Sequence, residues 1–340
     1  MTDMTREENK NYIKKSESLA KPRDITAISF LGDFNKYLPK KVQQVMMRKG
    51  SGKVPYMGFI VEPYGFFASF RIRDRAAAQA MLPDGYELAD ASIFKNGEKQ
   101  PLVIISAFST RTSAFMGMRL ECYIIGRNRE TGSMSWIIID YMTNTSSHDP
   151  KNGFCGYTGN PAIHTTTPYG ELLVDVKGSD GGGEFAVRAD LNAGAMEELD
   201  EELWVEGNMC VDYGGSLKDE SSVPFSLIFD PVLMEKAMRI PPDSVEIEAN
   251  AFLDSLIDPK RPESVAVFPY SQHFIIRQDL REGRIAGKQD LIREIRTFLD
   301  RDGLKTMSAE DLKRPLFRGM VIAFFANLGI IAFLLVKLLS

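Results

Sequence analysis

Short runs of alternating or continuous apolar residues dominate the chain from residue 56 to about residue 255. The runs are rich in β-branched and aromatic residues and end at Gly, Asp, Asn or Pro, a pattern typical of β-strands. The predicted strands are Gly65–Ile72, Leu102–Phe108, Met118–Ile125, Ser135–Tyr141, Glu171–Val176, Glu184–Ala189, Pro224–Phe229 and Val245–Phe252. Many antiparallel strands with regular turn signals predict a barrel or a sandwich.

Two short helices are predicted within this strand-rich region. Asp74 can cap a helix over residues 75–82, which the sequence Pro-Asp-Gly that follows would end. A second helix is expected to begin at Asp230 or Pro231 and to run through Ala237. After residue 254 prolines interrupt the pattern, and apolar residues then recur at helical spacing over 291–299. Residues 256–318 are therefore expected to form a partly helical connecting region.

The C-terminal segment is the longest apolar stretch. From Met320 to Val336 only Asn327 and Gly329 interrupt the larger apolar and alanine side chains, and a helix of about 20 residues spans a hydrocarbon core. Residues 319–339 are therefore expected to form a single transmembrane helix with the lipid bilayer as partner. Basic residues precede the helix (Lys313, Arg314, Arg318) and Lys337 follows it, so the positive-inside tendency places the main domain on the cytoplasmic side. A hydrophobic helix buried in an oligomer, or in a groove of its own domain, is the alternative.

Composition supports a folded body with a polar N-terminal extension. The chain has 340 residues, of which 44% are hydrophobic and 26% charged, and its net charge of −5 gives no general attraction to nucleic acid. Residues 1–25 are polar and are expected to form a mobile arm, which leaves 26–255 as the β-barrel domain. Three widely spaced cysteines form no disulfide framework, and three scattered histidines give no metal-ligand spacing. We expect no metal and no cofactor.

The pair Arg119 and Glu121 has two possible orientations. Residues two apart share a face of a strand, so Met118, Leu120 and Cys122 lie on the opposite face. If the apolar face points into the core, the charged pair meets solvent. If the apolar face packs against something outside a barrel, the pair lines the interior, as catalytic groups with shifted pKa values often do.

Two other places could supply a site. Arg71 and Arg73, at a strand end, could bind a carboxylate or lie in water. The long polar segment 140–157 follows an apolar strand, where loops often carry function, and it contains His148 and Lys151. His148 could move protons, whereas Lys151 could act as a nucleophile only if it is deprotonated; beside an aspartate it is otherwise an ordinary surface lysine.

The order of elements resembles the acetoacetate decarboxylase superfamily. The resemblance lies in a strand that enters the run Arg-Ala-Ala-Ala-Gln-Ala-Met-Leu-Pro-Asp-Gly-Tyr-Glu (75–87), then the strands over 102–108 and 118–141, and a loop ending at Tyr157. Pro-Tyr-Gly-Glu (168–171) continues the match, which covers roughly 55–255. It implies a mainly β fold with added helices, an antiparallel cone-shaped β-barrel around a closed hydrophobic pocket, followed here by the transmembrane helix.

The chemistry of that family is only partly present. Tyr157 matches the family tyrosine, but Thr158 replaces the proline, and glycine and asparagine stand where the Schiff-base lysines would be (159 and 160). The family's pocket glutamate falls near Phe115 or Met116, and its carboxylate-binding arginine could correspond to Arg71 or Arg73. Imine-based decarboxylation is therefore not expected unless Lys151 reaches the pocket.

Two main functions are compatible with these residues. The first is a membrane-anchored enzyme of acetoacetate decarboxylase type that acts on a lipophilic keto or unsaturated acid by decarboxylation, aldol–dehydration or cyclisation. A second copy of the chain is a further candidate partner. The enzyme's catalytic residues would be Glu121, His148 and Lys151, and its substrate-binding residues Arg71, Arg73, Arg119 and Tyr157. The second is a non-catalytic barrel that binds a lipid or other apolar ligand, and an empty structural barrel is a weaker third.

Overall fold

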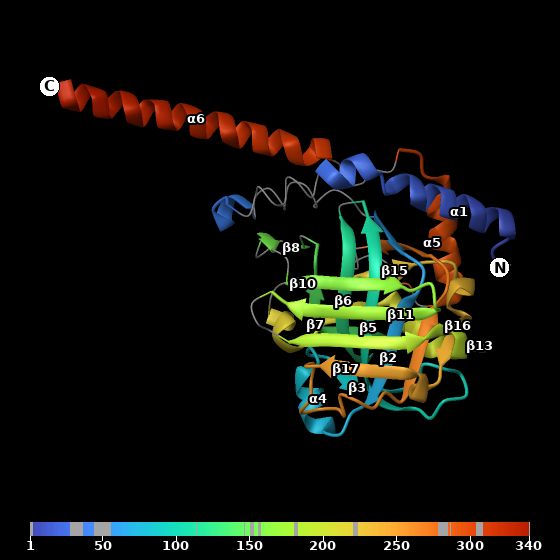
Figure 1. Ribbon diagram of the computed structural model, residues 1–340. Helices are drawn as coiled ribbons and strands as arrows, with labels where there is room; N and C mark the ends of the chain where they lie inside the picture. The colour runs from blue at the N-terminus through green and yellow to red at the C-terminus, as the bar shows by residue number, and fades with distance from the viewer. Residues whose placement is uncertain are drawn as a thin grey trace.

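A large, mostly antiparallel sheet forms the centre of the molecule (Figure 1). The computed structural model describes residues 3–27, 37–43, 56–113, 115–145, 147–149, 153–155, 158–179, 183–219, 224–277, 285, 287–303 and 309–339. Within these residues the main sheet has 13 strands. Eight pair in the order β13 (Ala195–Glu198), β16 (Lys236–Ile240), β18 (Ser264–Phe268), β2 (Gly65–Arg71), β5 (Gln100–Thr112), β1 (Tyr56–Val61), β19 (Gln272–Arg277) and β15 (Ser226–Ile228).

The remaining strands of the main sheet branch from β5. They are β3 (Tyr86–Leu88), β4 (Asp90–Ala91), β6 (Met116–Asn128), β7 (Met134–Thr143) and β14 (Val211–Tyr213), and β14 pairs with β7 in parallel. The first half of β5 pairs with β2 and its last three residues pair with β1, so two branches of the sheet leave the same side of one long strand. β8 (Ser147–Asp149) and β9 (Gly153–Cys155) form a separate hairpin.

A second sheet of four strands covers one face of the first. It contains β10 (Gly159–Thr166), β11 (Glu171–Gly178), β12 (Glu184–Asp190) and β17 (Val245–Asn250), and Figure 1 shows these strands running across those of the main sheet. One continuous hydrophobic core lies between the sheets, with Phe66 of β2 against Phe185 of β12 at a ring-centroid distance of 6.4 Å. The second sheet therefore defines the outer face of β2, β5, β6 and β7.

Helices cover the other branch of the sheet. α1 (Arg6–Leu19) packs against β1, β19 and α5 (Lys288–Asp300), and Tyr12 is fully buried with its ring 5.9 Å from that of Phe298. Thr5 and Glu8 form a capping box that fixes the start of α1. The expected mobile arm is therefore wrong for residues 6–19, because this polar helix is held by buried Tyr12 and by the ion pair of Glu8 with Arg296.

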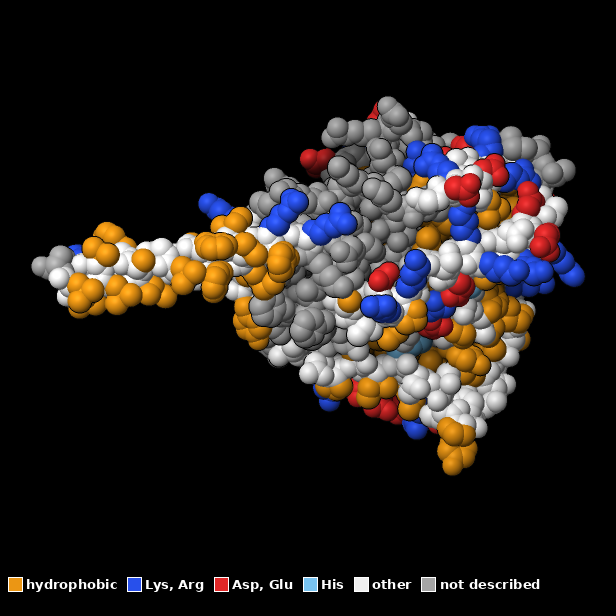
Figure 2. All heavy atoms as spheres, turned by 90° about the horizontal axis from the view of Figure 1, so that it is seen from above, with side chains coloured by type: hydrophobic (Ala, Val, Ile, Leu, Met, Phe, Trp, Pro, Cys, Tyr) orange, Lys and Arg blue, Asp and Glu red, His pale blue; other side chains and the backbone are white. Residues whose placement is uncertain are grey.

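The C-terminal helix α6 (Ala309–Leu339) extends away from the sheets (Figure 1). Its segment Phe317–Leu339 is long and apolar enough to cross a membrane, and none of its most apolar window is buried in the protein. Figure 2 shows hydrophobic side chains along the projecting helix and Lys or Arg side chains near its base. The alternative of a groove in its own domain does not apply to this arrangement.

The remaining helices are short. α4 (Arg75–Met81) is capped by Asp74 as expected, since both Ala76 and Ala77 donate to its carboxylate. Single turns occupy η1 (Leu191–Ala193), η2 (Glu202–Glu206), η3 (Gly207–Met209), η4 (Gly215–Asp219), η5 (Pro231–Met234) and η6 (Pro242–Ser244).

Three expectations about the fold need correction. The mainly β class is confirmed, but the described strands of the main sheet do not close into a barrel. The helix expected to reach Ala237 ends after one turn, because Ala237 belongs to β16 and pairs with Glu197. The prediction of a partly helical connecting region over 256–318 is wrong for residues 264–277. There β18 and β19 pair with β2 and β1 inside the main sheet.

Candidate functional site

The two faces of β6 meet different environments, and this decides the orientation of its charged pair. Met118, Leu120 and Cys122 belong to the core between the two sheets. Arg119 and Glu121 therefore point to the inner face of the main sheet. The observed orientation is therefore the one in which Arg119 and Glu121 line the interior, because the second sheet covers the apolar face of β6 on its outer side.

A cavity of about 230 Å³ lies on this inner face. Strands β1, β2, β5, β6, β7, β14, β15 and β19 contribute to its wall, together with residues of η2, η3, η4 and η5. The described lining residues are mainly aromatic and aliphatic: Met57, Phe59, Val61, Phe67, Phe108, Phe115, Tyr123, Trp136, Ile138, Tyr141, Trp204, Val211, Tyr213, Leu217, Phe225, Leu227, Met234, Phe274 and Ile276, with Arg119, Glu121, Asn208 and Gln272 as the polar members. Apolar walls with a few placed polar groups are typical of small-molecule sites.

The polar part of the wall is a hydrogen-bonded cluster. Arg119 donates from Nε to Oε1 of Glu121 at 2.6 Å, and its Nη2 forms an ion pair with the same oxygen at 2.6 Å. The two side chains are only 14% and 9% exposed. The Tyr123 hydroxyl donates to Oε2 of Glu121. The Arg119 guanidinium also stacks on the Tyr141 ring at 4.9 Å. Both oxygens of the carboxylate are thus satisfied by groups of the same strand.

The cluster favours the charged form of Arg119 and the neutral form of Tyr123. Burial acts to lower the pKa of Arg119, but the Glu121 carboxylate outweighs that effect and the pKa of the guanidinium is raised. Burial, together with the Glu121 carboxylate, raises the pKa of Tyr123 well above its usual value. Near neutral pH the wall therefore presents a guanidinium and a neutral phenol beside the carboxyl group.

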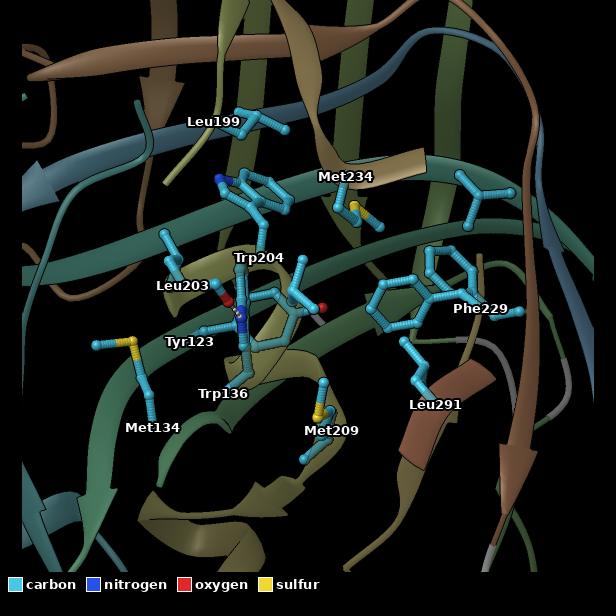
Figure 3. Close-up of a cluster of buried hydrophobic side chains, with 14 of the residues drawn as sticks. Tyr123, Met134, Trp136, Leu199, Leu203, Trp204, Met209, Phe229, Met234 and Leu291 are labelled. Atoms are coloured by element: carbon cyan, nitrogen blue, oxygen red, sulfur yellow. Dashed lines mark hydrogen bonds between the residues drawn. The ribbon is translucent and has the colours of Figure 1, made fainter. Parts of the chain in front are cut away.

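Two tryptophans form the centre of the apolar wall (Figure 3). Their rings lie 5.2 Å apart, and the indole N–H of Trp136 donates to the Leu203 oxygen while that of Trp204 donates to the Ile93 oxygen. Trp204 lies on η2, a single π-helical turn, an element that is frequent at functional sites. A Cβ at Gly207 would lie 2.9 Å from the Trp136 ring, so glycine is required for this close approach.

The remaining polar lining groups have partners within the protein. Asn208 donates to the Trp204 oxygen at 2.6 Å, and Gln272 donates to the Met234 sulfur at 3.6 Å. Among the described lining residues there is no lysine. The described part of the chain also contains no cluster of three His, Cys, Asp or Glu side chains that could hold a metal ion.

The other candidate residues lie elsewhere or outside the described structure. Arg71 is 52% exposed and pairs with Glu98 and Glu263, while Arg73 is 59% exposed and pairs with Asp258. Neither arginine lines the cavity, so we leave both out of the site.

In the predicted polar segment 140–157, Tyr141 lies on β7 and lines the cavity, but nothing described bears on the roles of His148, Lys151 and Tyr157. His148 lies on β8, whose side chains are not described, and Lys151 and Tyr157 lie outside the described residues.

Tyr123, Trp136 and Trp204 were missed as site residues. Tyr123 could have been found from the sequence because it continues the alternation of Arg119 and Glu121 along one strand face. Trp204 could not, because it reaches the cavity from a single helical turn that follows an acidic run.

Comparisons with known proteins give similarity to solved structures but no match by sequence. No family model matches the chain, and no curated protein has a similar sequence. The crystal structure of acetoacetate decarboxylase from Legionella pneumophila is similar with a TM-score of 0.39 and 13% identity, over 64% of this chain and 84% of that one. This is the family that the order of elements in the sequence resembles. Because the TM-score is low, the match assigns no function and no residue role.

Proposed function

We propose that this chain is a membrane-anchored protein whose cavity binds a small, mainly apolar ligand through one oxygen-bearing group. The observation that carries the proposal is the buried Arg119–Glu121–Tyr123 cluster, which forms the charged part of an otherwise largely apolar wall. A buried ion pair is weak evidence for stability, since apolar residues of similar volume often replace such pairs at no cost. Its position on a cavity wall therefore favours a role in recognition.

Arg119 is the group proposed to hold the ligand. Its bonds to Glu121 use Nε and Nη2, so the Nη1 edge of the guanidinium is not part of that pair. Stacking on Tyr141 fixes the plane of the guanidinium. A ligand oxygen can then accept a hydrogen bond from the edge while its apolar part contacts the aromatic wall.

Acid–base catalysis on the same ligand is a second candidate. It is favoured by the hydrogen bond between the Tyr123 hydroxyl and Glu121, which places a proton donor and an acceptor side by side on the cavity wall. In this version Arg119 holds the oxygen of a lipophilic keto or unsaturated acid, and Glu121 with Tyr123 moves a proton. The absence of lysine from the described lining gives no support to an imine step.

The membrane part of the proposal rests on α6. An exposed apolar helix of this length is unfavourable in water and fits the thickness of a bilayer. Arg314 and Arg318 lie at the end nearer the sheets, which by the positive-inside tendency puts the body on the cytoplasmic side. A lipophilic ligand would suit such a location. The exposed apolar surface of α6 is also compatible with packing between copies of the chain in a homo-oligomer.

Ligand binding can be measured with the protein's own fluorescence. The chain has two tryptophans and both line the cavity, so titration of the full chain in detergent micelles reports on the site directly. We expect saturable changes with small ketones or acids of lipophilic chains. Replacing the pair by apolar residues (Arg119→Met with Glu121→Leu) should weaken binding about 10- to 100-fold, the value of a hydrogen bond to a charged group.

The matched control is Arg71→Met, which removes an arginine from an exposed strand end outside the cavity. It should leave binding unchanged. Equal losses in both variants would contradict the proposal. Turnover of a keto or unsaturated acid that disappears in Tyr123→Phe, while binding persists, would identify the enzyme.

A further inference from the structure

The charges in the cavity wall cancel each other. Among the described lining residues Arg119 and Glu121 are the charged side chains, and their nitrogen and oxygen atoms lie 2.6 Å apart. Tyr141 and Tyr213 approach the same part of the wall from β7 and β14, and Tyr123 approaches it from β6. The recognition group is therefore a polar cluster without net charge, not an isolated cation.

A ligand carboxylate would gain little binding free energy from such a cluster. Its attraction to Arg119 would be opposed by repulsion from Glu121, because the two charges lie within one hydrogen bond of each other. It would also lose its hydration in a cavity whose other described lining residues are mostly aromatic or aliphatic. A ketone or ester oxygen has a much smaller hydration to lose and still accepts a hydrogen bond from the guanidinium edge.

We propose that the cavity selects an apolar ligand whose oxygen-bearing group is uncharged, such as a ketone, aldehyde, ester or protonated acid, and rejects the corresponding carboxylate. This inference rests on the proposed ligand-binding function and assigns its ligand class. It differs from recognition by an unpaired arginine, which would favour the anion.

The wild-type full chain in detergent micelles provides the first test. Methyl hexyl ketone and octanoate have similar lengths and differ mainly in charge, and both are titrated by tryptophan fluorescence. At about pH 7.5 the ketone should bind at least tenfold more tightly. Because only the protonated acid binds, its apparent affinity should rise about tenfold for each unit by which pH falls towards the carboxyl pKa of roughly 4–5.

The ketone titrated over the same pH range controls for titration of Glu121, Tyr123, Tyr141 and Tyr213, and its affinity should stay constant between about pH 5.5 and 7.5. An octanoate affinity that equals or exceeds that of the ketone at pH 7.5 overturns the inference and leaves the binding function intact. If neither compound changes the fluorescence at any pH, both the binding function and the inference fail.

A charge variant gives a second test. Glu121→Gln keeps the shape of the side chain but leaves Arg119 as a net positive charge. The affinity for octanoate, relative to that for the ketone, should therefore rise at least tenfold. The control Glu98→Gln changes the same residue type where its side chain is 77% exposed, and it should leave the preference unaltered. An unchanged preference in folded Glu121→Gln protein refutes the charge argument. If that variant does not fold, the wild-type pH series still decides.

Discussion

The structure makes its sharpest prediction about stability for the loss of one partner of the buried pair Arg119–Glu121. Glu121→Leu removes the carboxylate that accepts hydrogen bonds from Arg119 and Tyr123. The Arg119 side chain is only 14% exposed, and Tyr123 is buried. Removing one partner of a buried pair typically destabilises a protein by about 3–5 kcal/mol, because the other charge stays buried without compensation. We expect a loss of that size for this variant.

The matched variant removes the whole cluster. Replacing Arg119 by Met, Glu121 by Leu and Tyr123 by Phe leaves no buried polar group from the cluster, so the triple variant should lie within about 1–2 kcal/mol of the wild type. The single change would thus be more damaging than the triple change. Such strong non-additivity is expected only of groups in direct contact within a buried environment.

Urea denaturation of the full chain in micelles, followed by tryptophan fluorescence and circular dichroism, measures the difference. With a slope of about 3 kcal/mol per M, Glu121→Leu should move the midpoint down by about 1–2 M, and the triple variant by less than about 0.7 M. Additive effects, or a single variant within about 1 kcal/mol of the wild type, would mean that the pair is solvated and that β6 presents the opposite face to the core.

Three further outcomes follow from α1 and α6. Tyr12→Phe removes a buried hydroxyl that donates to the Ile228 oxygen at 2.9 Å, so it should cost about 1–3 kcal/mol in the same urea assay; no change would mean that α1 is not docked. A hydrogen bond from Arg296 is the largest of the effects that lower the pKa of Glu8 from 4.5 to about 2. Between pH 4.5 and about 2, Glu8 is protonated in the unfolded state but stays ionised in the folded state. Its contribution to the free energy of unfolding is therefore complete above pH 4.5 and is lost as pH falls to about 2. Hydrogen exchange of α1 should accelerate over that range in the wild type and not in Glu8→Gln. A chain that ends at Gly303 lacks α6, whose most apolar window is not buried in the protein, so it should keep its urea midpoint but leave the membrane fraction.

The local elements were largely predictable because they depend on nearby residues. The predicted strand Glu184–Ala189 matches β12 (Glu184–Asp190), and the predicted helix 75–82 matches α4 with its aspartate cap. The strand β18 was not predicted, because its four apolar residues stand in a short stretch between Pro262 and Pro269 that resembles a loop. β16 and β2 on its two sides supply the hydrogen bonds that make it a strand.

The N-terminal helix shows a different limit of sequence reasoning. Residues 6–19 are mostly polar, and a polar segment without an apolar stripe is not expected to pack. It packs because its charged residues find partners far along the chain: Glu17 binds Arg111 and Glu8 binds Arg296. Composition cannot show partners 94 and 288 residues away, so the segment looked mobile.

The orientation of the site itself could not be decided from one strand. Alternation along β6 is symmetric: it shows that Arg119 and Glu121 share a face, and it is equally compatible with that face being wet or enclosed. The second sheet decides the orientation, because its Val174 and Phe185 belong to the same hydrophobic core as the apolar face of β6. Once that face is covered, the charged pair has to lie within the concave side, where aromatic residues from distant segments enclose it. A buried charge pair on a strand therefore becomes informative about function only when the element that covers the opposite face is known.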